Sequence, residues 1–570
     1  MVMKKRVDAK NFTGTVENIM ITLILLIIFS GYVLVTFTSP IAFGDEGYYS
    51  SMGKWIAENL IYPKYHPLWG TSVIMYPTTR PPIGHITSSA FYLLFGEAGI
   101  KLMPPLFALL SALMLFILFK NFGKRFLGAL TALILLLLPA TVKYGVLNYP
   151  EVQMLFFITS GVYFFFIGNI RNNAKFFIVS GIMLGFAVLS DITSLFILPV
   201  FFFLALYQRK LWKNTALLFL FLLLTISPWV ARNLALYNSP CIQPFFSEQC
   251  GVVKLVEPEK QEVNIALKRP EVSTGMGIYK FGLVQYVRFG FGVTGLLALI
   301  GIVFLIERKR DWKYAFFILW LIALVFANLY ISKDNPRTED MLRYSLFALP
   351  AIALAIGIVL EEIRKRFDVK YLYIIVPGIV FSLLVFFGKY LIAYIIAIGT
   401  AFVLLISKAS ENNAYQGIAS AIFVLLLYFI AFYGVVEITN MHRVKQFSPG
   451  FIEACEWVRE NLPENASYAA IYVHPAEYNC YRKFMPIQGL PDGVIIRLWA
   501  NETSYELLKK WKIDYIIVEG FTIVPDSMLH PESYPLSFVA FLEKSPYFEK
   551  IFDNTQKYGF RGGVKIFKVK

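Results

Sequence analysis

Two adjacent carboxylates, Asp45 and Glu46, directly follow the first long apolar run of this 570-residue chain. Other charged residues stand in loops or at the ends of later apolar runs: Arg80, Glu151, Asp191, Arg232, Arg337 and Arg343. A carboxylate can act as a general base, and a guanidinium group can bind phosphate oxygens through two parallel hydrogen bonds. If these residues gather on one face of the protein, they could take a proton from a hydroxyl group and stabilise a phosphate.

The composition indicates which elements carry these residues. Hydrophobic residues make up 57% of the chain and charged residues only 16%, whereas about a quarter of an average soluble domain is charged. Apolar runs near the ~20 residues that cross the hydrocarbon core recur along most of the length. The first run, at about 17–39, is too long for the apolar region of a signal peptide and lacks a cleavage site of small residues. The sequence therefore predicts a polytopic α-helical membrane protein whose first span is retained.

The charge pattern predicts the orientation of these spans. Most of the net charge of +15 comes from short basic clusters in alternate loops, such as QRKLWK (208–213) and ERKRDWK (307–313). This is the positive-inside pattern, so the charge indicates topology and not a nucleic-acid partner. It predicts a multi-pass protein of the cell membrane with a cytoplasmic N-terminus and about thirteen spans. We expect them at about 17–39, 98–119, 127–147, 152–169, 175–190, 192–207, 215–231, 288–306, 314–331, 344–360, 371–388, 390–407 and 417–438.

Two regions outside the spans are unusually large. The first outer loop, 40–97, contains Tyr48, Met52 and Ile56 at helical spacing, which predicts an amphipathic helix in the membrane interface over 45–60. The segment ITSSAFYLLFG (86–96) is too short to span and is expected to be re-entrant or interfacial. We divide the chain into a transmembrane core, 1–439, and a C-terminal domain, 440–570.

The C-terminal region changes from long apolar runs to alternating helix and strand patterns. SPGFIEACEWVREN (448–461) and TSYELLKKW (503–511) are typical of helices, the former with Ser448 as N-cap. ASYAAIYV (466–473), DYIIV (514–518) and GVKIFKV (563–569) are typical of strands. The sequence thus predicts a small extracytoplasmic α/β domain, and it contains no glycine-rich nucleotide-binding motif.

In this topology the acids and arginines lie on the outer face, where two interpretations compete. Asp45 follows Gly44 just before a predicted helix, so it could simply cap that helix, and an arginine at a span end can simply extend toward water. However, at least three acids and four arginines collect on this one face. A sugar carried on a lipid phosphate would fit such a face, because arginines stabilise the departing phosphate and a carboxylate deprotonates the acceptor hydroxyl.

Several stretches resemble one family. DEGYYSSMGKWIAENLIYP (45–63), the basic-Pro-Pro motif at RPPIGH (80–85), SPWVARN (227–233) and LRYSLFALPAIAL (342–354) are similar to the C-type (GT-C) membrane glycosyltransferase superfamily. The nearest branch is that of the dolichyl-phosphate-mannose protein mannosyltransferases and aminoarabinose transferases, in a prokaryotic form. The likeness covers roughly residues 15–360, and EACEWVREN…DYIIV resembles the outer domain that follows this core in many prokaryotic members.

The resemblance implies an activity and its residues. It implies an inverting glycosyltransferase that moves one hexose or pentose, most simply mannose, from a polyprenyl- or dolichyl-phosphate donor to a hydroxyl of an extracytoplasmic protein, lipid or glycan. It implies a catalytic or acceptor-binding role for Asp45 and its neighbour Glu46, and it matches Glu151 to the second acidic position. Arg80, Arg343 and Tyr344 match donor-site positions, and we add Arg232 and Arg337 as candidates for binding the donor phosphate.

The sequence departs from the family in places. Relatives often carry Lys near the position of Asp191, and neither a sugar-binding repeat domain nor the Trp-Trp-Asp motif of oligosaccharyltransferases is present. Four cysteines do not make a disulfide framework; Cys241–Cys250 is the preferred pair, and Cys455–Cys480 is compatible with the outer domain. No cofactor is required by the sequence, although a divalent metal held by the carboxylates is compatible with it.

Two alternatives come from other classes of protein. A membrane transporter should carry ionisable residues near the middle of the bilayer and often shows an internal repeat, and neither feature is visible here. A receptor or scaffold with an outer binding domain would use the acids only as helix caps. It predicts that loss of the Asp45 carboxylate costs only about 1 kcal/mol, the value of a lost cap.

Overall fold

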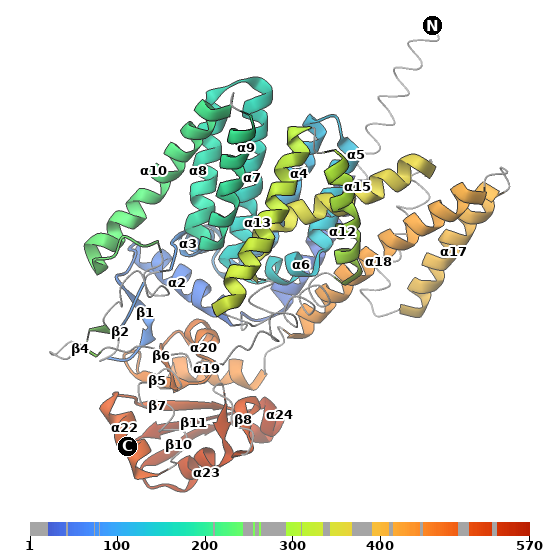
Figure 1. Cartoon of the computed structure of the whole chain (residues 1–570). Coiled ribbons are helices and arrows are strands. Elements are labelled where there is room, and N and C mark those ends of the chain that lie inside the picture. The colour runs from blue at the N-terminus through green and yellow to red at the C-terminus, as the bar shows by residue number, and fades with distance from the viewer. Residues whose placement is uncertain are drawn as a thin grey trace.

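The computed structural model arranges the chain in three layers (Figure 1). A bundle of helices forms the first layer, the loop 40–97 (hereafter the first loop) forms the second, and a C-terminal α/β domain forms the third. The fold class predicted from the sequence is therefore confirmed. The structure describes residues 21–41, 44–72, 75–78, 80–208, 211–242, 255–256, 262–263, 292–308, 311–334, 343–367, 390–409, 414–444, 449–487, 501–526 and 533–570.

Twelve of the thirteen predicted spans coincide with a helix or a bent pair of helices, and the remaining one (371–388) lies outside the described residues. The helices of the bundle are Ile21–Thr38, α4 (Glu97–Asn121), α5 (Arg125–Leu137), α6 (Pro139–Gly145), α7 (Pro150–Arg171), α8 (Ala174–Ser190), η1 (Ile192–Ile197), α9 (Leu198–Tyr207), α10 (Trp212–Tyr237), α12 (Gly292–Glu307), α13 (Trp312–Asp334), η6 (Leu346–Ala348), α15 (Leu349–Phe367), α17 (Tyr390–Ala409) and α18 (Ala414–Val444).

Fewer of these helices can cross a membrane alone than hydropathy predicts. Among the described residues, six are long and apolar enough, or seven if α5 and α6 count as one span. Others, such as α8 with 17 residues, are short. A hydropathy window counts apolar residues without regard to where the helix ends, so it also counts short helices that pack inside the bundle.

A proline bends the chain toward the site described below. α5 ends at Leu137, Leu138 is extended (ψ 130°), and Pro139 starts α6 at an angle of 63°. Proline has no backbone N–H and disfavours a helical residue before it, so the helix cannot continue straight. The turn that follows α6 carries Asn148 and Tyr149 to the start of α7.

The first loop folds into α2 (Asp45–Asn59), β1 (Tyr65–Gly70), β2 (Met75–Pro77) and α3 (Ile83–Phe95). The helix predicted over 45–60 is present, but it is not a one-sided interfacial helix. Tyr48, Met52 and Ile56 are buried, and so are Glu46 and Ser50 on other sides, because α2 packs against both α3 and the C-terminal domain. The segment predicted as re-entrant or interfacial forms α3.

The C-terminal domain shares its sheet with the first loop, which the sequence did not predict. The strand order is β10-β11-β7-β5-β6-β1-β2, and β1 runs parallel to β6 with Trp69 opposite Phe484. The three predicted strands form β5, β7 and β11. The domain's elements are α19 (Pro449–Asn461), β5 (Ser467–Ala470), α20 (Val473–Asn479), β6 (Lys483–Pro486), α22 (Glu502–Lys510), β7 (Tyr515–Glu519), η8 (Gly520–Thr522), β8 (Ile523–Val524), β9 (Tyr534–Pro535), α23 (Leu536–Lys544), β10 (Phe548–Asp553), α24 (Thr555–Gly562) and β11 (Val564–Val569), with a separate ribbon of β3 (Leu255–Val256) and β4 (Glu262–Val263).

Within the described residues lies the second of the two disulfides considered from the sequence. Cys455 of α19 and Cys480, directly after α20, are bonded. This bond ties α20 to the neighbouring helix. Cys250 and Ser448 lie outside the described residues, so the Cys241–Cys250 pair and the cap of α19 remain predictions.

We expect the C-terminal domain to lose stability as the pH rises through the range in which Glu519 titrates. Burial raises the pKa of this carboxyl at the end of β7 to about 8, above its usual 4.5. Between these values the folded domain holds a proton that the unfolded chain releases, so the free energy of unfolding should fall by up to about 1.4 kcal/mol per pH unit. Thermal unfolding of wild type and Glu519→Gln from about pH 5 to about pH 8 checks this, and equal slopes in the two proteins would contradict it.

Candidate active site

Asp45 lies at the start of α2, but its side chain does not cap the helix. Gly44 is the N-cap residue with φ +46°, a left-handed conformation that favours glycine, and α2 has no side-chain capping bond. The backbone N–H of Asp45 instead donates to the hydroxyl of Tyr149 (3.1 Å). The carboxylate is thereby left to face other charged groups, and the capping interpretation is wrong.

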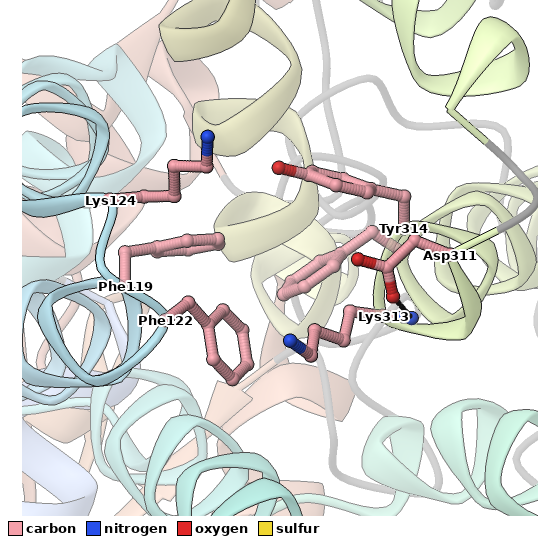
Figure 2. Close-up of a pocket in the computed structure, with 7 residues that line it drawn as sticks. Phe119, Phe122, Lys124, Asp311, Lys313 and Tyr314 are labelled. Carbon is pink, nitrogen blue, oxygen red and sulfur yellow. Dashed lines mark hydrogen bonds between the residues drawn. The ribbon is translucent and has the colours of Figure 1, made fainter.

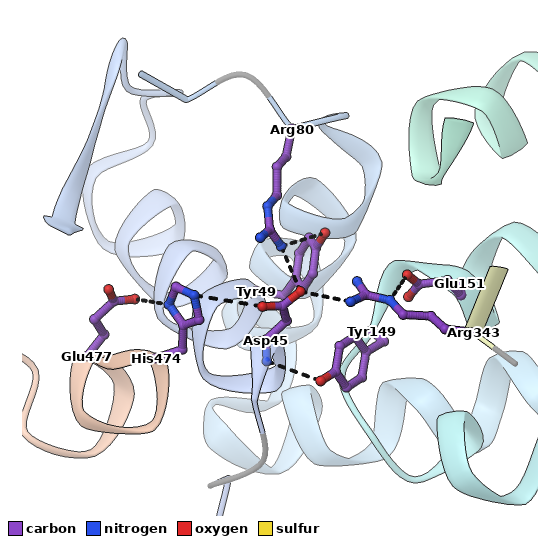
Figure 3. A network of polar contacts seen from close by, with 8 residues as sticks. All are labelled: Asp45, Tyr49, Arg80, Tyr149, Glu151, Arg343, His474 and Glu477. Carbon is purple, nitrogen blue, oxygen red and sulfur yellow. Dashed lines mark hydrogen bonds and ion pairs between the residues drawn. The ribbon is translucent and has the colours of Figure 1, made fainter. Parts of the chain in front are cut away.

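Two arginines from distant parts of the chain converge on Asp45 (Figure 3). Its Oδ2 accepts from Nη1 of Arg80 (3.1 Å) and from Nη1 of Arg343 (2.9 Å). Arg343 also donates through Nε to the fully buried Glu151 in the first turn of α7. Arg343 therefore bridges two of the predicted acids, and four of the predicted site residues form one continuous network.

Aromatic rings fix the positions of both guanidinium groups. Arg80 lies over the ring of Tyr48 (4.3 Å to the centroid) and donates to the hydroxyl of Tyr49 (3.2 Å). Arg343 lies over the ring of Tyr149 at 4.6 Å, and the half-buried ring of Tyr344 is 5.8 Å away. A cation over an aromatic face is attracted by the ring's negative charge density, so the arginines are held in place before a substrate binds.

The charges around Asp45 keep it ionised. Burial alone would raise the pKa of the carboxyl, but the charges of Arg80 and Arg343, joined by His474 when its imidazole is protonated, outweigh burial and hold the pKa well below its usual range. Asp45 is therefore a carboxylate at neutral pH and can accept a proton. The same cations make it a weak base, so a proton that it accepts needs a further acceptor.

Glu46 faces a different network from its neighbour. It is buried, and its Oε1 accepts from the backbone N–H of Asn148 (3.3 Å). The Asn148 side chain in turn donates to the hydroxyl oxygens of Ser50 on α2 (2.9 Å) and Ser88 on α3 (3.1 Å). These contacts hold the turn that carries Tyr149 and Glu151 against α2 and α3, so Glu46 supports the site from outside the ion-pair network.

Arg232 also lies outside the ion-pair network of Asp45. It donates to the carbonyl oxygens of Pro63 (2.9 Å) and Thr78 (3.2 Å), and its guanidinium lies 4.6 Å from the centre of Trp229. These bonds hold the part of the first loop that leads to Arg80. The structure thus gives Arg232 a role in positioning Arg80, while Arg337 lies outside the described residues.

Sequence reasoning missed the role of three groups of this site. Tyr48 and Tyr49 stand three and four residues after Asp45. In a helix this spacing places side chains beside one another, so the proximity of both tyrosines to Asp45 could have been predicted. His474 of α20, in contrast, has its Nε2 3.7 Å from Oδ1 of Asp45. The sequence gives no signal for this contact, because it depends on how the C-terminal domain packs against α2.

A small cleft elsewhere in the bundle contains none of these residues (Figure 2). It has an empty volume of about 300 Å³ between the end of α4 and the start of α13. Its lining residues are Phe119, Phe122, Lys124, Asp311, Lys313, Tyr314 and Phe317. Glu97, at the other end of α4, contacts Lys54 of α2 (3.6 Å). The cleft is thus a helix length, roughly 35 Å, from the contact between α4 and α2.

Comparisons with known proteins agree with this fold. Residues 79–231 match the family model for dolichyl-phosphate-mannose-protein mannosyltransferase. The fold is similar to that of apo ArnT from Cupriavidus metallidurans, at TM-score 0.59 and 15% identity over 97% of this chain and 98% of that one. It is also similar to the apo oligosaccharyltransferase of Archaeoglobus fulgidus, at TM-score 0.58 and 15% identity over 88% of this chain and 69% of that one. A search among curated protein sequences gives no match.

The family-model match and the shared fold confirm the class predicted from the sequence. Residues 79–231 match a glycosyltransferase family model, and the chain shares the fold of membrane glycosyltransferases of the C-type superfamily. The matched segment runs from just before Arg80 to Ala231, within α10, and it includes Glu151.

Proposed function

We propose that the chain is an inverting transferase that moves one sugar, of the mannose type, from a polyprenyl- or dolichyl-phosphate to a hydroxyl group outside the membrane. The observation that carries this proposal is the carboxylate of Asp45 held between Arg80 and Arg343 at the start of the first loop. The network joins an acid that can act as a base to cations that can bind a phosphate. In this proposal the N-terminus is cytoplasmic, and the first loop and the C-terminal domain are extracytoplasmic.

In this mechanism the acceptor hydroxyl loses its proton to Asp45 and attacks the anomeric carbon of the donor sugar. The bond from that carbon to the phosphate oxygen breaks, and the oxygen leaves with the electron pair. Arg80 and Arg343 stabilise the charge that grows on the phosphate, which lowers the transition state more than the ground state. Attack from the face opposite the phosphate inverts the anomeric centre.

Structures of similar fold support a lipid-phosphate donor. One is ArnT from Cupriavidus metallidurans bound to undecaprenyl phosphate, at TM-score 0.58 and 15% identity. The other is the Archaeoglobus fulgidus oligosaccharyltransferase with an inhibitory peptide and a dolichol-phosphate, at TM-score 0.56 and 14% identity. This chain lacks the Trp-Trp-Asp motif, so we favour transfer of a single sugar over transfer of an oligosaccharide.

The proposal is tested with purified protein in liposomes that contain radiolabelled dolichyl-phosphate-mannose, dolichyl-phosphate-glucose or an undecaprenyl-phosphate pentose. Released and transferred label are both counted, because water can replace a missing acceptor. Label that leaves the mannosyl lipid faster than from protein-free liposomes supports the proposal. Absence of release from all three lipids, together with absence of binding to dolichyl phosphate, would overturn it.

We expect that removing divalent metals leaves the transfer rate within about twofold. The two oxygens of Asp45 already face three cationic or potentially cationic side chains, and Oε1 of Glu151 accepts from Arg343. Among the described residues no group of three or more His, Cys, Asp or Glu side chains could hold a metal ion. Because the arginines can supply the charge that a metal would provide, transfer should persist in chelator. Loss of activity in EDTA that Mn²⁺ or Mg²⁺ restores would contradict this.

A further inference from the structure

The C-terminal domain reaches the site through α20, which packs directly against the backbone of α2. A Cβ atom at Gly47 would lie 2.0 Å from the carbonyl oxygen of His474, so only glycine permits this approach. Nδ2 of Asn479 donates to the carbonyl oxygen of Ile41 (2.7 Å), just before α2. The disulfide at Cys480 holds the end of α20. The position of His474 relative to Asp45 is therefore determined by contacts on both sides.

His474 lies between two carboxylates (Figure 3). Its Nδ1 is 3.2 Å from Oε2 of Glu477, one turn along α20, and its Nε2 is 3.7 Å from Oδ1 of Asp45. The rings of Tyr48 and Trp69 contact the imidazole at 5.3 Å each, both edge-on. With the Nδ1 proton donated to Glu477, the lone pair of Nε2 faces a carboxylate oxygen, and the gap between them can accommodate a proton.

We propose that His474 and Glu477 form a positioning pair that receives the acceptor's proton from Asp45, so that the C-terminal domain completes the active site. This rests on the proposed function. The proton that leaves the acceptor hydroxyl binds Oδ1 of Asp45 and then moves to Nε2 of His474, which becomes an imidazolium. Glu477 stabilises the imidazolium through Nδ1–H. Asp45 returns to a carboxylate between its two arginines, and the proton reaches water after the products leave.

The surrounding charges favour this direction of transfer. Arg80 and Arg343 hold the pKa of Asp45 low, so Asp45 does not retain a proton. Burial raises the pKa of the Glu477 carboxyl, which is fully buried and whose Oε1 has no hydrogen-bond partner within the described part of the chain. His66 also interacts electrostatically with His474, and Arg80 and Tyr48 interact with Glu477. The low pKa of Asp45 thus favours passage of the proton from Asp45 to the neighbouring imidazole.

The test compares wild type with His474→Gln and Glu477→Gln in the full-length protein, using release or transfer of mannose from dolichyl-phosphate-mannose between about pH 5 and about pH 9. Glutamine can place its amide near the position of Nε2 but cannot take up a proton. We expect kcat of His474→Gln to fall about 10²-fold, the size of a lost proton acceptor, with KM for the donor unchanged. The acidic limb of the wild-type pH profile should disappear, because glutamine neither gains nor loses a proton in this range.

Glu477→Gln should shift the same limb to lower pH, because the imidazolium loses its anionic partner. The matched control is Tyr478→Phe, a buried residue of the same helix that packs near Ile41 and Ile100 and does not contact Asp45. It should keep the wild-type kcat and pH profile.

Three results would overturn the inference. The first is a wild-type rate and profile in His474→Gln, and the second is an unchanged acidic limb in both glutamine variants. The third is an equal loss in Tyr478→Phe, which would indicate a general loss of packing around α20. If the wild-type protein released sugar from none of the three lipids and did not bind dolichyl phosphate, the proposed function would fail with the inference. Activity in wild type and in His474→Gln alike would remove only the inference.

Discussion

Asp45→Asn is expected to reduce the rate of sugar transfer by about 10²–10⁴-fold, the usual contribution of a general base. The amide keeps the size of the carboxylate and an oxygen that can accept from Arg80 and Arg343. It cannot accept a proton at neutral pH, so only the chemical step should suffer. Transfer of mannose in liposomes, measured with saturating donor, gives the change in kcat.

The interpretation of this variant depends on showing that it folds. Two arginines lose their counter-charge, so the thermal midpoint and the binding of dolichyl phosphate should be measured beside the rate. Asp553→Asn is a matched control, because Asp553 pairs with Lys550 (2.8 Å) in β10, on the surface of the C-terminal domain. It should not change the rate. Equal activity in Asp45→Asn and wild type would reduce Asp45 to a structural ion pair and move the search for the base to Glu151.

Arg343→Lys is expected to lower kcat/KM for the sugar donor by about 10²–10³-fold. This is the usual cost of removing one hydrogen-bond donor from an anion that develops in the transition state. A guanidinium presents several N–H groups in a fixed plane, and Arg343 uses Nη1 for Asp45 and Nε for Glu151. A lysine ammonium is a single charge that cannot reproduce both bonds in one geometry. The charge is kept, so the variant separates geometry from net charge.

A second arginine offers a matched control for this substitution. Arg308 after α12 also bridges two acids, Glu361 and Glu362 of α15, away from the ion-pair network of Asp45. Arg308→Lys should therefore change stability by a similar amount and leave donor kinetics unchanged. If both variants lose activity equally, or if Arg343→Lys retains the wild-type kcat/KM, Arg343 does not bind the departing phosphate.

The expected sizes of these effects also distinguish an enzyme from a receptor. If the carboxylate of Asp45 only stabilised the first loop, its replacement would lower the free energy of unfolding by about 1 kcal/mol and would not specifically affect the chemical step. The predicted losses of 10²-fold correspond to about 2.7 kcal/mol in the transition state of one reaction. Rates and thermal midpoints measured on the same variants therefore decide between the two.

The sequence by itself determined the features that depend on local composition and spacing. Recurrent apolar runs are sufficient to predict the membrane helices, because burying apolar side chains in lipid requires such runs. Asp45 and Arg80 were identified because the acidic pair and the basic-Pro-Pro motif both lie in the first loop. Helix α2 followed from the helical spacing of Tyr48, Met52 and Ile56. Strands β5, β7 and β11 were predicted from their short apolar or alternating patterns.

Only the tertiary structure decided which of these residues meet. Asp45 and Arg343 are 298 residues apart, and their ion pair depends on how α2 and the segment before α15 pack around α7. His474 reaches Asp45 because β1 of the first loop joins the sheet of the C-terminal domain and because Gly47 allows α20 to touch α2. Contacts between distant segments leave no periodic pattern in the chain, so the packing of the layers, rather than local spacing, brings the base, its two cations and the histidine together.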